Sequence, residues 1–170
     1  MQNDASSVEI MAGHGYKLFV CGLVFCIFIL VTGCGSGEIK QVGEPVDTTL
    51  FRFSFHDPEI LEYYPGIEIP RGRKLLQIWL TIENTSEQAY TMFAEDFQIQ
   101  WGDENDDFGT CILDAGPCTL PDSYLLKPGY SQQGTMLFLI PKECAVVTMA
   151  YQEIKASGKT GDAYFVEIQL

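Results

Sequence analysis

One loop of this 170-residue chain has side chains at a spacing suited to a metal ion. Asp103, Asn105 and Asp107 alternate along it, which lets a tight turn direct several oxygens at one hard cation such as calcium. The loop departs from an EF-hand, because Phe108 stands where Gly is needed and Asp114 where a bidentate Glu is needed. We expect at most weak calcium binding. The alternative is a solvated hairpin loop held open by like charges.

Catalysis by a nucleophile and a histidine would depend on a single residue, because His56 is the only histidine after Cys34. The sequence around it, Phe55-His56-Asp57-Pro58, predicts a strand end and a turn with the histidine facing solvent. The chain contains no Gly-X-Ser-X-Gly elbow, no His-Glu-X-X-His and no glycine-rich phosphate loop. We therefore expect a protein that is not an enzyme.

A third segment has the composition of a contact surface. Tyr63 and Tyr64 are followed by Arg71, Arg73 and Lys74, the densest positive charge in an acidic chain. Aromatic side chains beside arginine are favoured anchors at protein interfaces. The alternative is a loop whose apolar side chains fold back over the end of the domain.

The elements that would position these residues are strands, because hydrophobic residues alternate with polar ones at a period of two. Four segments show the pattern: 51–56, 76–83, 97–101 and 164–170. Two further runs, 134–140 and 145–151, are apolar on both faces and predict central strands. Turn-forming residues separate the runs, and 86–96 fits either a short strand or one helical turn. The pattern predicts an all-β sandwich.

The charge of the chain restricts its partners. The 23 acidic and 10 basic residues give a net charge of −13. Residues 1–33 contain Asp4, Glu9 and Lys17, so the remainder holds 21 acids and 9 bases, a net charge of −12. A domain this acidic repels phosphate backbones, so we expect no nucleic-acid partner.

The N-terminal segment has the parts of a secretory signal. Lys17 precedes an uncharged apolar run over 18–32, which small residues follow. The run is shorter than the roughly 20 apolar residues that a membrane-spanning helix needs. Asp4 and Glu9 fit a basic export flank poorly, so Met11 is the expected true start.

Residues 31–34, Val-Thr-Gly-Cys, resemble the lipobox of bacterial lipoprotein precursors. The resemblance implies cleavage before Cys34 and acylation of its sulfur, with palmitate or a similar chain. The protein would then stay on the extracytoplasmic face of the cell membrane. An uncleaved membrane anchor is the alternative. We expect a signal peptide over 1–33, a lipidated tether over 34–47 and a folded domain over 48–170.

The folded domain would hold three cysteines, Cys111, Cys118 and Cys144. An exported location permits a disulfide. The turn-forming residues between Cys111 and Cys118 favour that pair, and unbridged buried thiols are the alternative. No Cys-X₂-Cys spacing is present to indicate zinc.

Residues 49–170 resemble the telokin-like, immunoglobulin-fold domains of unknown function found in lipoproteins of Gram-positive bacteria. An alternating strand ending in Asn, a Phe-centred strand leading to an acidic-glycine loop, a Pro-Gly turn and a Gly-Thr strand closing on Pro carry the resemblance. The matching positions are Asn84, Phe97, Asp103, Pro128, Gly129, Gly134, Thr135, Phe138 and Pro141. The resemblance implies an immunoglobulin-like antiparallel sandwich of about seven to eight strands, and it transfers no catalytic residues.

The function expected from the sequence is therefore that of a membrane-anchored, extracytoplasmic lipoprotein with a non-catalytic binding or adaptor domain. Its partner would be a cell-surface protein or ligand whose identity the sequence does not give. The alternative is a lipoprotein that binds a small ligand or a divalent cation, with calcium at Asp103, Asn105 and Asp107 as the cofactor.

Overall fold

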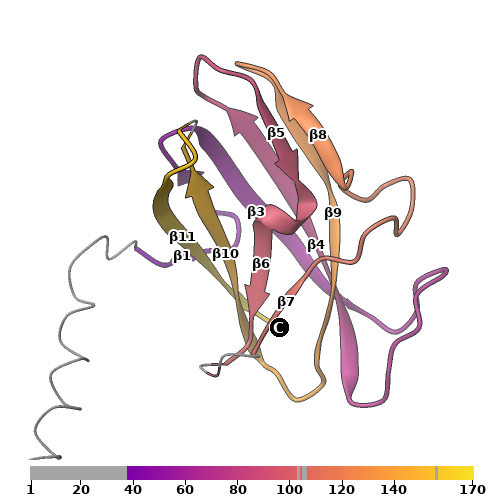
Figure 1. Ribbon diagram of the computed structural model, residues 1–170. Coiled ribbons are helices and arrows are strands. Elements are labelled where there is room, and N and C mark those ends of the chain that lie inside the picture. The colour runs from indigo at the N-terminus through magenta and orange to yellow at the C-terminus, as the bar shows by residue number, and fades with distance from the viewer. Residues whose placement is uncertain (1–37, 103, 105–106, 156) are drawn as a thin grey trace, which may run out of the picture. The chain divides into compact units, whose positions relative to one another are not determined.

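A computed structural model describes residues 38–102, 104, 107–155 and 157–170 (Figure 1). Within these ranges the chain forms strands and one short 3₁₀ helix. The strands are β1 (Lys40–Gln41), β2 (Val46–Asp47), β3 (Phe51–Leu61), β4 (Arg73–Asn84), β5 (Tyr90–Phe93), β6 (Phe97–Gln100), β7 (Phe108–Thr110), β8 (Ser123–Leu126), β9 (Ser131–Pro141), β10 (Val146–Ile154) and β11 (Thr160–Gln169). The helix is η1 (Ala94–Asp96).

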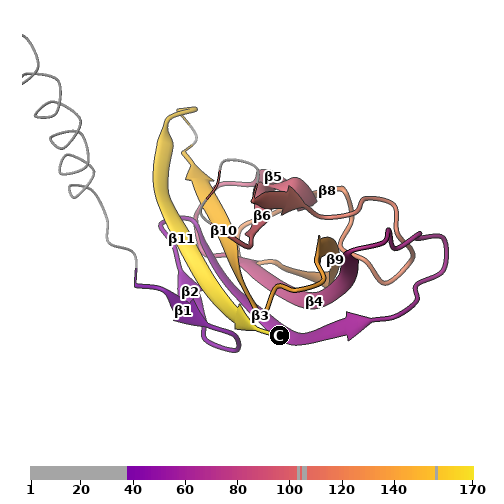
Figure 2. The same cartoon turned by 90° about the horizontal axis from the view of Figure 1, so that it is seen from below.

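Two sheets pack face to face, which confirms the predicted all-β sandwich. One has the order β1-β11-β10-β6-β7 and the other β2-β3-β4-β9, while β5 and β8 form a separate pair. Figure 2 shows β11, β10 and β6 in one layer and β3, β4 and β9 in the other. The described chain has eleven strands where seven to eight were expected, because short strands flank the main ones. The sandwich is also not wholly antiparallel, since β1 pairs with β11 in parallel.

The predicted alternation places the core. Phe51, Phe53 and Phe55 are buried on the inner face of β3, and β4 turns its own buried row toward the same layer. Phe53 meets the ring of Phe97 edge to face at 5.4 Å and that of Tyr151 at 5.6 Å, which ties β3 to β6 and β10 across the sandwich. This aromatic cluster joins the two layers.

The folded part begins earlier than the predicted boundary at residue 48. Lys40 and Gln41 pair with β11, and the backbone N–H of Gly43 donates to Phe55 O at 2.8 Å. Val46 is 3% exposed and belongs to the core. Part of the segment expected to be a tether is thus strand, because edge backbone groups of β3 and β11 are available to pair with it.

The expected strand end at Asp57-Pro58 is also wrong, since β3 continues to Leu61. The register with β4 shifts between His56 and Glu59, and Asp57 has a φ of 49°. A bulge of this kind accommodates extra residues. Pro58, which has no backbone N–H, therefore does not need to donate to the ladder there. The turn-forming dipeptide therefore bends the strand without ending it.

Residues 86–96 contain both of the structures that the sequence left open. Strand β5 leads directly into η1, where Ala94 is 2% exposed. The carboxylate of Asp96 accepts a hydrogen bond from the Phe93 N–H at 2.8 Å and closes the turn. Burial of Asp96 raises the pKa of its carboxyl group, and the hydrogen bond from Phe93 opposes that shift.

Of the two strands predicted to be central, β10 lies between β11 and β6 as expected, but β9 is the last strand of its sheet. Its apolar character has another cause. The segment around Thr119 and Leu120 covers the open edge, with Leu120 N–H donating to Thr135 O at 2.8 Å and Thr135 N–H donating to Cys118 O at 3.1 Å. An edge strand that is covered by another segment is shielded from solvent in the same way as a central strand.

Among the residues that the structure describes, no helix combines the length and the apolar character needed to cross a membrane.

Candidate functional site

The predicted calcium loop is described only in part. Asp103 and Asn105 lie outside the described residues. The Asp107 carboxylate accepts a hydrogen bond from the Glu104 N–H at 3.2 Å and lies over Gly102, where a Cβ would stand 2.0 Å from it. Within the described part of the chain, no three metal-binding side chains gather. Calcium binding remains a prediction.

His56 lies on the outer face of β3, where its Nε2 is 2.7 Å from the Ser54 hydroxyl. A serine and a histidine at this distance form the first link of a nucleophilic triad, which also needs a carboxylate to orient the other ring nitrogen. The hydrogen bonds of the described residues supply no such carboxylate at His56 Nδ1. Ser54 and His56 face Thr81 and Trp79 across the strand pair, on the outward side of the sheet.

The favoured disulfide is not formed, because Cys111, Cys118 and Cys144 are all free thiols in the described domain. Cys111 is buried in the core, whereas Cys118 is exposed beside the edge of β9. The two side chains therefore face different environments. Burial raises the pKa of the Cys111 thiol to about 11, with the charges of Glu95 and Asp122 adding to the shift. The alternative of unbridged thiols describes this structure.

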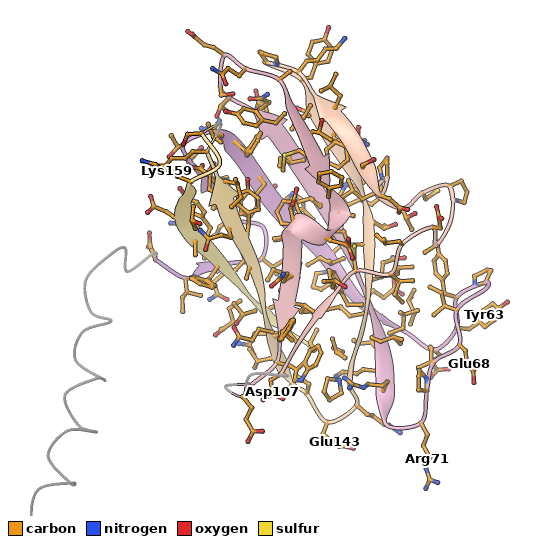
Figure 3. The ribbon with its side chains drawn as sticks, viewed as in Figure 1. Tyr63, Glu68, Arg71, Asp107, Glu143 and Lys159 are labelled. Atoms are coloured by element: carbon orange, nitrogen blue, oxygen red, sulfur yellow. The ribbon has the colours of Figure 1, made fainter. Side chains whose placement is uncertain are left out.

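The two tyrosines of the predicted contact segment differ in their surroundings. Tyr63 is 75% exposed and projects from the connection between β3 and β4 (Figure 3). Tyr64 is half-buried, with its backbone paired to Ile67 and its hydroxyl against Gly116. Only Tyr63 presents its ring to a partner, while Tyr64 holds the connection against the domain.

Arg71 and Arg73 border a hollow at the end of the sandwich, which we call the basic hollow. Its volume is about 580 Å³. Four cationic side chains line it, together with four apolar residues, Gly72 and one acidic residue. They are Arg71, Arg73, Lys74 and Lys142; Ile60, Leu61, Ile69 and Pro70; and Glu62. The hollow therefore combines positive charge with an apolar wall.

Backbone pairing positions the cations. The register of β4 with β9 sets Arg73 opposite Pro141, and the Lys142 N–H donates to Gly72 O at 3.0 Å. These bonds bring Lys142, from the connection after β9, beside the arginines of the β3–β4 connection. Gly72 has a φ of 83°, a conformation that costs glycine little and other residues more.

Two of the four cations also close the end of the sandwich. The Arg73 guanidinium lies 5.3 Å from the centroid of the Trp101 ring, a cation–π arrangement. The Lys74 ammonium donates a hydrogen bond to the carbonyl of Cys144. Arg71 and Lys142 are exposed, and the described residues give their side chains no hydrogen bond and no carboxylate within 4.0 Å. Figure 3 shows Arg71 pointing away from the body of the domain.

Sequence reasoning found Arg71, Arg73 and Lys74 but missed Lys142 as their neighbour. Lys142 follows Pro141 at the end of a predicted strand, and antiparallel pairing of that strand with 76–83 would have brought it to the arginines. The sequence alone does not state which strands pair. It also gave no sign that Glu153 is fully buried, with one carboxylate oxygen accepting from the Leu50 N–H at 3.2 Å and the other without a partner among the described residues.

A β-sandwich is the class that this fold defines. No family model matches the chain, and no curated protein matches it. Solved structures with the same fold come from Gram-positive bacteria, at identities that establish the fold alone.

Three of these structures align over most of the domain. One is described as a "putative lipoprotein" (ycdA) from Bacillus subtilis, with a TM-score of 0.60 and 12% identity over 78% of this chain and 39% of that one. The chain thus spans about two fifths of that protein. The yjhA protein from the same organism gives 0.58 and 18%, covering 77% of this chain and 100% of that chain. A functionally unknown protein from Listeria monocytogenes gives 0.58 and 11%, covering 79% and 89%.

Proposed function

We propose that this chain is a lipoprotein held on the extracytoplasmic face of a membrane by a lipid on Cys34, with a sandwich that serves as a non-catalytic binding or adaptor domain. We also propose that the sandwich is a telokin-like domain and that residues 1–33 are a signal peptide. The proposal is supported by the fold shared with the Bacillus lipoprotein candidate and by the sequence resemblance over 49–170.

The observation that carries the proposal is the order of segments. An apolar run over 18–32 ends directly at Val31-Thr32-Gly33-Cys34, and the first strand of the sandwich begins at Lys40. Two or three acyl chains on Cys34 would hold the protein durably, because each buried methylene contributes about 0.8 kcal/mol. The few residues between Cys34 and Lys40 would keep the sandwich close to the lipid surface.

The contact surface proposed for this domain is the β3–β4 connection with Tyr63, Arg71 and Arg73. Tyrosine and arginine are among the residue types that most often dominate the binding energy of protein interfaces. Tyr64, which packs against the domain, supports this surface from beneath. The partner is proposed to be a component of the cell surface.

Cys34→Ser tests the membrane address in cells that make the full chain. We expect the variant to be neither labelled by a palmitate analogue nor processed, so that it keeps the apolar run before residue 34. Cys26→Ser is the matched control, because it removes a thiol from the apolar run and should leave labelling and processing intact. A Cys34→Ser protein processed and retained like the original would refute the proposal.

A further inference from the structure

The basic hollow gives the proposed partner a chemical character. Resting on the binding function proposed above, we infer that the hollow is the docking site for an acidic segment of a partner protein that also carries aliphatic side chains. The inference depends on the charge, the geometry and the apolar wall of the hollow.

The charge argument starts from the imbalance of the whole domain. The chain after residue 33 has 9 basic and 21 acidic residues, and four of the nine bases line this one hollow. Glu62 is the only acidic residue lining it. Cations gathered at one place in a domain of net charge −12 create a local positive potential that attracts an anion and orients its approach.

The arginines have the geometry for carboxylates. A guanidinium presents a planar fork of N–H groups that matches a carboxylate with two parallel hydrogen bonds. Arg73 is already oriented by the ring of Trp101, so less side-chain entropy is lost when it binds. Arg71 and Lys142 stand free of ion pairs in the described part of the chain, so binding an anion breaks no existing contact.

The apolar wall favours a protein segment over a simple polyanion. Ile60 is 39% exposed, and Leu61, Ile69 and Pro70 line the same hollow. A phosphate polymer gains nothing from burying aliphatic surface, whereas a peptide can place a leucine there while its acidic residues meet the cations. Tyr63, which follows Glu62 on the same connection, presents an exposed aromatic ring.

The position of the hollow also favours a partner other than the anchoring membrane. Figures 1 and 2 both place the β3–β4 connection on the opposite side of the sandwich from β1, the strand through which the chain enters the domain. A surface on that side faces away from the point of entry. It is therefore presented to other molecules.

A peptide-binding experiment with the full chain in neutral phosphatidylcholine vesicles tests the inference. The probe is a fluorescent synthetic peptide of glutamate and leucine residues, and its affinity is measured by anisotropy. The double variant Arg71→Glu/Lys142→Glu reverses two cations that have no described structural contact. Lys127→Glu/Lys159→Glu is the matched control, because it changes the net charge equally at exposed sites elsewhere.

We expect the Arg71→Glu/Lys142→Glu variant to bind at least about tenfold more weakly than the unchanged protein, with the control much closer to it. A peptide with glutamine for glutamate, and one with serine for leucine, should each bind more weakly. Equal losses in the two double variants would overturn the inference, as would binding that ignores the glutamates. Polyphosphate or anionic vesicles bound in place of the peptide would overturn it as well. A Cys34→Ser protein that is processed and retained like the original would refute the membrane address and leave this measurement unchanged.

Discussion

At the scale of single residues, Asn84 organises one end of the sandwich. It is fully buried, and its amide donates to Gln88 O at 2.7 Å and to Leu126 O at 2.9 Å. Its side-chain oxygen accepts from both the N–H and the hydroxyl of Ser86. The Asn-X-Ser sequence at 84–86 is therefore a turn closed by a buried asparagine.

Replacing Asn84 by alanine should remove these bonds together and leave the Gln88 and Leu126 carbonyls without this donor. We expect a loss of about 2–4 kcal/mol in the free energy of unfolding, measured by urea titration. Gln98→Ala on the exposed face of β6 is the control and should stay within about 0.5 kcal/mol. A small loss for Asn84→Ala would show that water replaces the amide.

The different surroundings of Cys111 and Cys118 lead to a second prediction at this scale. Because the pKa of Cys111 is raised to about 11 by burial, almost all of this thiol is protonated and unreactive at pH 8. Alkylation of the folded protein should therefore label Cys118 first, and Cys111 should be modified quickly only in denaturant or as the pH approaches its pKa. Peptide mapping by mass spectrometry separates the two. Labelling of Cys118 that requires a reductant would instead reveal the disulfide with Cys111.

At the scale of elements, glycine at position 134 explains how an edge strand becomes buried. A Cβ there would stand 2.7 Å from the backbone nitrogen and Cα of Leu120, closer than unbonded atoms approach. The segment at Thr119–Leu120 can therefore lie against β9 only because residue 134 has no side chain. The Gly-Thr pair in the family resemblance thus has a structural reason in this chain.

Gly134→Ala should push the covering segment away from β9 and weaken the hydrogen bonds that Thr135 makes with it. We expect a loss of roughly 1–3 kcal/mol in the free energy of unfolding. Faster hydrogen exchange at the Leu120 and Thr135 amides should accompany it. Gln133→Ala, one residue earlier on the exposed side of the strand, serves as the control. Unchanged exchange in the Gly134 variant would contradict the close approach.

The elements were predictable where a single property decided them. Alternation located β3, β4, β6 and β11, because a strand with one buried face shows its period directly in the sequence. The same reasoning failed at Asp57-Pro58, since a bulge lets a strand continue through residues that normally end it. It also failed for β9, because burial by a covering segment and burial between two strands leave the same apolar pattern.

At the scale of the whole molecule, the excess of negative charge should weaken the fold at low ionic strength. Only Lys40–Glu38 and Arg52–Asp47 form ion pairs in the described part of the chain, and both are exposed. Raising sodium chloride from about 10 to about 150 mM shortens the screening length from about 30 to about 8 Å. We expect the melting temperature to rise over this range, and a fall would show that attractive pairs outweigh repulsion.

Calcium binding leads to a separate prediction, which the melting temperature also tests. If the loop of Asp103, Asn105 and Asp107 binds calcium, millimolar calcium should raise the melting temperature above that in sodium chloride of equal ionic strength. Asp103→Asn/Asp107→Asn should remove only this additional rise. Equal melting temperatures in the two salts would reject the hypothesis.

The sequence by itself determined the class of fold, because the period of hydrophobic residues specifies strands and their buried faces. It also determined the acidic character and the order of apolar run, cysteine and domain on which the proposed membrane address depends, since these are properties of adjacent residues. The tertiary structure alone decided that Lys142 joins Arg71 in one hollow, that β9 lies at an edge and that Cys111 and Cys118 face different environments. Those facts depend on which strands pair and in what register, and pairing is set by contacts between residues far apart in the chain.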